Sequence, residues 1–310
     1  MSAPPGPGAG YGPAGYGPYG PAGYGRDQGP TARLLLSAPD RPGLVAAVAE
    51  FIYRNGGDVT HADQHTDEQE RVFFQRVEFR LGTFKLPREV TGEAVAEMAS
   101  PLGMSWALRY SDEERRVAVL ASHQPHCLVD LLGRWHAHEL PGRPVLVVSN
   151  HPDHAELVGR FGLAYHYLPV TAGTRASQEA ALLGLLEAAG VELVVLARYM
   201  QVLSEAVIGR FPARVINIHH SFLPAFSGAR PYNQAHARGV KLIGATAHYA
   251  TAELDQGPII EQDTTRVSHR DGPADLARSG RDLETVVLAR AVRLHLSDRV
   301  LVHGRKTIVF

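Results

Sequence analysis

Short runs of almost wholly apolar residues recur in the second half of this chain, and they restrict the folds that it can adopt. A strand with one solvated face alternates apolar and polar residues, whereas a run that is apolar throughout is buried on both faces. Stretches long enough for helices separate the runs. This pattern predicts a Rossmann-like α/β domain with a mainly parallel sheet covered by helices on both sides. The clearest runs are residues 117–121, 144–148, 191–197 and 214–218.

Polar side chains stand at the end of the last of these runs. Asn217 and His219 are two residues apart, and in a strand this spacing points both side chains to one face. Asp255 lies on a Gly/Pro loop that opens another apolar run. A carboxamide can steady an oxyanion while an imidazole and a carboxylate move protons, so the set suits acyl chemistry without a covalent intermediate. Asp255 would work best as a base if burial raised its pKa.

Residues 31–110 show a second pattern, in the order strand, helix, strand, strand, helix, strand. The first helix carries the apolar stripe Leu44, Val48, Phe51 and Ile52, and Asp40 is placed to cap it. The order βαββαβ predicts a small ferredoxin-like domain. Residues 111–116 are charged and are predicted to be the linker to the domain formed by residues 117–310.

Residues 1–30 are nearly all Gly, Pro, Ala and Tyr, so we expect a disordered tail. The net charge of -1 gives no electrostatic case for binding nucleic acid or an anionic membrane surface. The longest apolar run is too short to span a bilayer. The single cysteine, Cys127, excludes an intrachain disulfide framework and fits a reducing compartment. These features predict a cytoplasmic protein.

The motif around the polar pair resembles the folate-dependent formyltransferase family, and within that family it resembles the deformylases. The resemblance rests on residues 217–232, 244–249 and 253–255 and extends from Arg33 to the C-terminus. It implies that Asn217, His219 and Asp255 are catalytic. It also implies hydrolysis of 10-formyltetrahydrofolate to formate and tetrahydrofolate, in one-carbon metabolism and the supply of formate for purine synthesis. No permanently bound cofactor is implied.

The same resemblance places the folate. Residues 196–203 match the segment that holds the pterin in this family, which implies that Met200, Val202 and Leu203 contact the ring. His248 and Gly257 are expected to line the same cavity. Since side chains between a strand and a helix also pack as ordinary core, the family motif decides this assignment.

Water is the acceptor that the sequence favours. Relatives that formylate a phosphorylated sugar amine carry a Gly-rich loop after the first strand of this domain, to bind phosphate through backbone amides. Residues 121–128 of this chain contain no glycine, and Pro125 removes an amide donor. Formyl transfer to an amine and a regulatory folate-binding protein remain alternatives. The histidines lack the spacing of a metal motif, so we expect no metal.

The N-terminal unit resembles an ACT domain, because Asp-Arg-Pro-Gly-Leu at residues 40–44 follows its first strand. Such domains often pair with one another and bind amino acids. The resemblance implies a homo-oligomer, and it places Asp40, Gly43 and Asn55 where an amino-acid effector would bind. A purely structural role in oligomerisation stays open.

Overall fold

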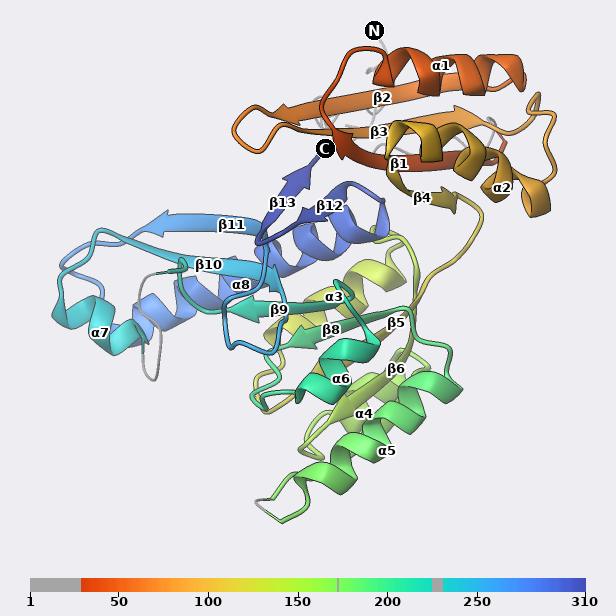
Figure 1. The fold of residues 1–310 in the computed structure, drawn as a ribbon. Helices are drawn as coiled ribbons and strands as arrows, with labels where there is room; N and C mark the ends of the chain where they lie inside the picture. Colours follow the sequence, from red (N-terminus) through yellow and green to blue (C-terminus); the bar gives the residue numbers. More distant parts are fainter. Residues whose placement is uncertain (1–28, 172, 225–230) are drawn as a thin grey trace, which may run out of the picture.

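Figure 1 shows the computed structural model of this chain, in which residues 29–171, 173–224 and 231–310 are described. Most of the predicted disordered tail falls on residues 1–28, outside the described residues. The N-terminal sheet is antiparallel, has the strand order β2-β3-β1-β4 and carries two helices. This is the predicted βαββαβ fold. Its elements are β1 (Thr31–Pro39), α1 (Leu44–Arg54), β2 (Asp58–Asp67), β3 (Val72–Arg80), α2 (Arg88–Ala99), the 3-10 turn η1 (Ser100–Leu102) and β4 (Ser105–Tyr110).

The apolar stripe of α1 packs on this sheet as predicted, with Leu44, Val48 and Ile52 buried in one core with β1 and β3. The prediction that Asp40 caps the helix is wrong. The N-cap is Gly43, which has a left-handed backbone and makes no side-chain cap. A turn separates Asp40 from the helix. The backbone N–H of Asp40 instead donates to the carbonyl of Arg71.

The second domain is built on a seven-stranded sheet with the order β11-β10-β9-β8-β5-β6-β7. Strands β5 to β9 are parallel, whereas β10 and β11 are antiparallel additions at one edge. The elements are β5 (Arg116–Ala121), α3 (His126–His136), β6 (Arg143–Ser149), α4 (Ala155–Arg160), β7 (Ala164–Tyr167), α5 (Arg175–Ala188), β8 (Leu193–Ala197), α6 (Glu205–Arg210), β9 (Val215–His219), α7 (Pro231–Ala237), β10 (Leu242–Tyr249), β11 (Ile259–Arg266), α8 (Pro273–Leu296), β12 (Val300–His303) and β13 (Lys306–Val309).

Helices cover both faces of this sheet, as continuous apolar strands require. Every residue of β8 is buried. One core contains side chains of α3, α4 and α8, and the core on the other face contains side chains of α5 and α6. No helix in the described part of the chain is both long and apolar enough to cross a bilayer.

The strand order reverses between β5 and β8, because β6 and β7 follow on one side of β5 and β8 and β9 on the other. Loops that leave the carboxyl ends of neighbouring strands diverge at such a point and open a crevice. The segments after β5, β8 and β9 meet there, so the topology places the predicted catalytic pair beside the crevice.

The end of the chain returns to the N-terminal domain (Figure 1). Arg33 and Arg115 share the carboxylate of Asp298, just beyond α8. In the hairpin β12–β13, Lys306 pairs with Asp67 at 2.9 Å and His303 Nε2 lies 2.8 Å from Glu70. Polar contacts therefore join the two domains at several points.

Candidate active site

The sequence-predicted catalytic side chains converge at the end of β9. His219 is the last residue of that strand, and Asn217 shares its face two residues earlier. Asp255 lies in the loop between β10 and β11 and has a left-handed backbone, with φ 55°. Its Oδ2 atom is 3.2 Å from His219 Nδ1. The loop thus brings a carboxylate to the imidazole from the neighbouring edge of the sheet.

His248 completes this group, although the sequence placed it only in the cavity lining. Its Nδ1–H donates to the carbonyl of Tyr249 at 3.0 Å, so the neutral ring presents a lone pair at Nε2. That atom is 3.2 Å from Asn217 Nδ2 and 3.6 Å from Asp255 Oδ1. The register of β9 and β10 explains the contact, because Asn217 and His248 are directly opposed. We refer to Asn217, His219, His248 and Asp255 as the catalytic group.

Hydrogen bonds set the charge of the Asp255 carboxyl group. The hydrogen bond from His219, together with the contact to His248, holds its pKa well below its usual range and outweighs the effect of burial, which acts in the opposite direction. The raised pKa that would suit Asp255 as a general base is therefore not found. Asp255 therefore stays ionised near neutral pH.

The other nitrogen of the His219 ring makes no hydrogen bond with the described residues. This atom, Nε2, is buried. Since Nδ1 faces Asp255, Nε2 is the atom of this ring that can meet a substrate.

A cavity of about 660 Å³ adjoins the catalytic group, and Asn217, His219, His248 and Asp255 all line it. Met200, Val202 and Leu203, in the segment after β8, also line it. Met200 and Val202 are 58% and 49% exposed, whereas Leu203 is buried. Exposed apolar side chains in a cavity wall suit a flat aromatic ligand such as a pterin.

Gly257 lies behind the cavity wall, which differs from its predicted place in the lining. A Cβ atom on this residue would be 1.6 Å from the carbonyl oxygen of Tyr249. That oxygen accepts the hydrogen bond from His248. The absence of a side chain at Gly257 therefore allows His248 to be oriented.

The sequence did not single out the polar part of the wall. Glu284 of α8 is 1% exposed, and its carboxylate lies 2.6 Å from His126 Nε2 and accepts a hydrogen bond from the hydroxyl of Tyr232 at 3.0 Å. Arg198 Nε lies 3.4 Å from the same carboxylate, and Arg198 Nη1 donates to His220 Nδ1 at 2.8 Å. We call these five residues the Arg198 network. They come from five separate segments, and no short motif connects them.

The charge of His220 is fixed by this network. Burial and the neighbouring Arg198 guanidinium lower the pKa of His220 to about 4. The ring is therefore neutral near pH 7. It stacks on the ring of His219, with centroids 4.8 Å apart, so the Arg198 network directly adjoins the catalytic group.

The glycine-free loop after β5 supports the segment that is expected to hold folate. Ser122 donates to Asn150 Oδ1 at 2.6 Å and accepts a hydrogen bond from the backbone N–H of Met200 at 3.0 Å. From this loop Gln124 contributes to the cavity wall.

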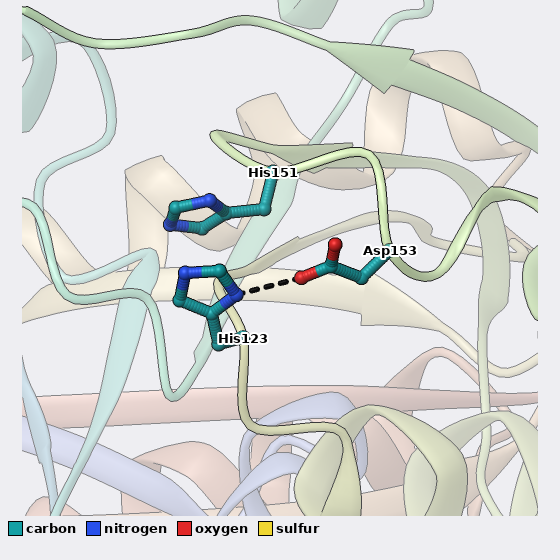
Figure 2. A group of neighbouring side chains, drawn as sticks. All are labelled: His123, His151 and Asp153. Carbon is teal, nitrogen blue, oxygen red and sulfur yellow. Dashed lines mark hydrogen bonds and ion pairs between the residues drawn. The ribbon is translucent and has the colours of Figure 1, made fainter.

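Two groups of potential metal ligands occur in the described part of the chain. Figure 2 shows the first, in which the rings of His123 and His151 stack and His123 Nδ1 lies 2.6 Å from Asp153. It lies outside the cavity lining. The second contains His126, Cys127 and Glu284, and burial raises the pKa of the Cys127 thiol, so it stays protonated. The absence of a metal stays a prediction.

The predicted effector residues flank α1. Gly43 has φ 95°, with open space around it, and Asp40 is exposed. Asn55 follows the helix and donates from its amide to the carbonyl of Phe51 at 2.8 Å.

Comparisons with known proteins agree with both domains. The Formyl transferase family model matches residues 115–292, and the ACT domain model matches residues 32–93. A formyltetrahydrofolate deformylase from Synechocystis is 54% identical over 280 residues, which cover 90% of this chain and 98% of the relative. The deformylase from Bacillus subtilis is 47% identical, with 90% and 93% covered.

Among solved structures, a deformylase matches more of this chain than a transformylase does. A formyltetrahydrofolate deformylase from Pseudomonas syringae is 46% identical, has a TM-score of 0.90 and matches 92% of this chain and 96% of its own. A glycinamide ribonucleotide transformylase from Symbiobacterium toebii is 34% identical, has a TM-score of 0.62 and matches 66% of this chain and 98% of its own. Both the sequence and the two-domain fold thus lead to one family, and this chain belongs to the formyltetrahydrofolate deformylases.

Proposed function

We propose that this chain hydrolyses 10-formyltetrahydrofolate to formate and tetrahydrofolate. The observation that carries the proposal is the contact between Asp255 and His219, 3.2 Å apart, at the edge of a cavity with an apolar wall. One water oxygen bonds to the formyl carbon, and the bond from that carbon to N10 breaks. N10 takes up a proton, and formate leaves as an anion after losing one proton to solvent.

Each member of the catalytic group has a role in this proposal. Asn217 donates to the formyl oxygen as negative charge develops on it. His219 Nε2 takes a proton from the attacking water and returns it to N10 as the bond breaks. Asp255 orients His219 and the water, and it stabilises the imidazolium. His248 positions Asn217.

The apolar wall supports the assignment of the folate. Met200, Val202 and Leu203 present aliphatic and thioether groups from one segment, and Leu254 of the Asp255 loop also lines the cavity and is 64% exposed. A pterin bound there would cover these side chains, and burial of apolar surface favours binding.

Replacement of the carboxylate tests the proposal. In Asp255→Asn, formate release from 10-formyltetrahydrofolate should fall by about 10²–10⁴-fold, because the amide cannot stabilise the imidazolium. Binding of tetrahydrofolate, followed by fluorescence titration, should stay near that of the wild type. Asp263→Asn, at an exposed ion pair on β11, is the matched control and should keep its activity. Formate release by Asp255→Asn at the wild-type rate would remove Asp255 from the mechanism, and a wild-type protein that requires an amine acceptor would contradict hydrolysis.

We propose that the ACT domain pairs with a second copy of the chain and binds an amino acid beside Asp40, Gly43 and Asn55. The open surroundings of Gly43 and the exposure of Asp40 support this placement. Sedimentation and a formate-release assay with each amino acid would test it. We place the enzyme in the cytoplasm, since the single thiol suits a reducing compartment.

A further inference from the structure

The Arg198 network has no part in the steps proposed above, although it forms much of the polar cavity wall. Arg198, His220, Tyr232 and Glu284 all line the cavity, and His126 supports Glu284 from behind. The side chains of Arg198 and Glu284 are 14% and 2% exposed. Burying a charged pair this deeply lowers stability, because both charges lose their contact with water.

Two further features of the network oppose stability. Arg198 follows β8 with φ 61°, a left-handed backbone that favours glycine. Gly280 lies inside α8, one turn before Glu284, and a Cβ atom there would be 1.9 Å from the hydroxyl oxygen of Tyr232. Glycine within a helix is unfavourable, but here it lets Tyr232 reach Glu284. Strain and unfavourable local choices that persist in a natural sequence concentrate at functional sites.

Two buried nitrogen atoms in this arrangement make no hydrogen bond with the described residues, although Arg198 Nε also lies 3.4 Å from the Glu284 carboxylate. Arg198 Nε and His219 Nε2 form no hydrogen bonds within the described ranges, and the stacked ring of His220 lies between the two residues. Buried polar atoms are almost always satisfied by protein or by a small polar molecule. A small polar occupant therefore fits this end of the cavity.

The chemistry of the product indicates what that occupant is. Hydrolysis places a new carboxylate beside Asp255, which is ionised, and the two negative charges repel each other. An arginine offers the directed hydrogen bonds that a carboxylate accepts best. Arg281, the other cavity-lining arginine in the described part of the chain, is exposed.

We propose that Arg198 forms a subsite that binds the carboxylate of formate, and that Glu284 is a positioning residue that holds the guanidinium in place through the Arg198 network. This inference rests on the proposed function, because the reaction generates formate next to His219. The subsite compensates for the charge of Asp255 and helps to separate the two products.

The test measures binding of ¹³C-labelled formate to the full-length protein saturated with tetrahydrofolate, by NMR line broadening. Arg198→Met should weaken formate binding by at least about tenfold, the loss expected for one hydrogen bond to a charged group. Arg198→Lys should restore part of the affinity. The affinity for tetrahydrofolate should stay unchanged in both variants.

Because Arg198→Met removes a positive charge from beside the buried carboxylate of Glu284, the double variant Arg198→Met/Glu284→Gln guards against misfolding and should show the same loss of formate binding. Arg278→Gln, at an exposed arginine of α8 outside the cavity, is the matched control. Equal formate affinity in wild type and both Arg198→Met variants would overturn the subsite, and so would a loss confined to Arg281→Gln. Formate binding can be measured without turnover, so the two proposals fail separately. A wild-type protein that binds formate through Arg198 but does not hydrolyse formyltetrahydrofolate would refute the proposed function and leave the subsite standing.

Discussion

Gly257 supports the catalytic group without contributing a side chain to it. Its Cα approaches the backbone of Tyr249 so closely that any Cβ would overlap the carbonyl oxygen. That carbonyl fixes the tautomer and the orientation of His248, which in turn contacts Asn217 and Asp255. Gly257 thus influences the positions of His248, Asn217 and Asp255, although it has no side chain of its own.

Gly257→Ala should therefore displace the Tyr249 carbonyl and turn His248 away from Asn217. A displacement of about 1 Å at a catalytic residue lowers turnover by about 10²-fold. We expect this loss in kcat for formate release, with folding retained in circular dichroism. Gly133→Ala, at a helical glycine with open space around it, is the control and should leave kcat unchanged.

At single positions, the sequence predicts the residues that a strand or a motif brings together. Asn217 and His219 share a face because strand side chains alternate, and the family motif adds Asp255. The Arg198 network could not be predicted in this way. In the sequence, Glu284 cannot be told apart from the other charged residues of an amphipathic helix. Only the packing of α3, α7 and α8 brings His126 and Tyr232 next to it.

Among the elements, α8 connects the cavity to the domain interface. It is 24 residues long and presents Ala277, Arg281 and Glu284 to the cavity. Near its other end the ring of His295 is buried, and its Nδ1 atom lies 2.7 Å from the hydroxyl of Tyr249, the residue that also holds His248. Helix α8 therefore contacts β10 near both ends, since its Leu276 also packs in one cluster with Ile243.

Gly280 allows a test of whether α8 needs space for the Tyr232 side chain. Replacing an exposed helical glycine by alanine usually stabilises a protein by about 0.5–1 kcal/mol, and Gly184→Ala in α5 should behave so. Gly280→Ala should instead destabilise the protein by about 1–3 kcal/mol, because the new methyl group collides with Tyr232. Urea unfolding measures both. A stabilised Gly280→Ala protein would show that Tyr232 does not need this gap.

His295 makes stability depend on pH. Burial, with the positive charge of Arg115, lowers the pKa of His295 to about 3, below its usual value near 6.5. Between those two pH values the unfolded chain binds a proton that the folded protein excludes, so this contribution to stability is lost as the pH falls from about 6.5 towards 3. In His295→Gln the slope of the unfolding free energy over this window should decrease by about 1.4 kcal/mol per pH unit. Urea titrations at several pH values test this, and an unchanged slope would contradict it.

The sequence predicts the strands that are buried on both faces, because their residues are apolar throughout. Strands β5, β6, β8 and β9 fall within about two residues of the apolar runs, because the core on each side demands apolar side chains. The edge strand β7 and the hairpin β12–β13 were not predicted. They are short and half-exposed, so their residues carry no distinctive pattern.

For the whole molecule, Asp298 is one of the residues that join the two domains. Its carboxylate pairs with Arg33 from the ACT domain and with Arg115, while its backbone carbonyl accepts from Arg76 at 2.8 Å. It has a left-handed backbone, which asparagine also tolerates. The residue is 7% exposed, so water screens these contacts poorly.

Asp298→Asn should therefore remove charge without adding backbone strain. Since it leaves Arg33 and Arg115 without their shared partner, we expect a loss of about 1–3 kcal/mol and earlier unfolding of the ACT domain in calorimetry. Asp112→Asn, at an exposed pair with Arg88, should change stability by less than about 0.5 kcal/mol. Equal melting curves for the wild type and Asp298→Asn would show that other contacts join the domains.

The hairpin β12–β13 connects the C-terminal end of the chain to the N-terminal domain. His303 contacts Glu70 across 233 positions of sequence, and Lys306 contacts Asp67 across 239. During synthesis the ACT domain leaves the ribosome long before these partners exist. The domain has a core of its own, but the hairpin contacts form only after the final residues have emerged, and trimming a few of those residues would remove these contacts from the domain interface.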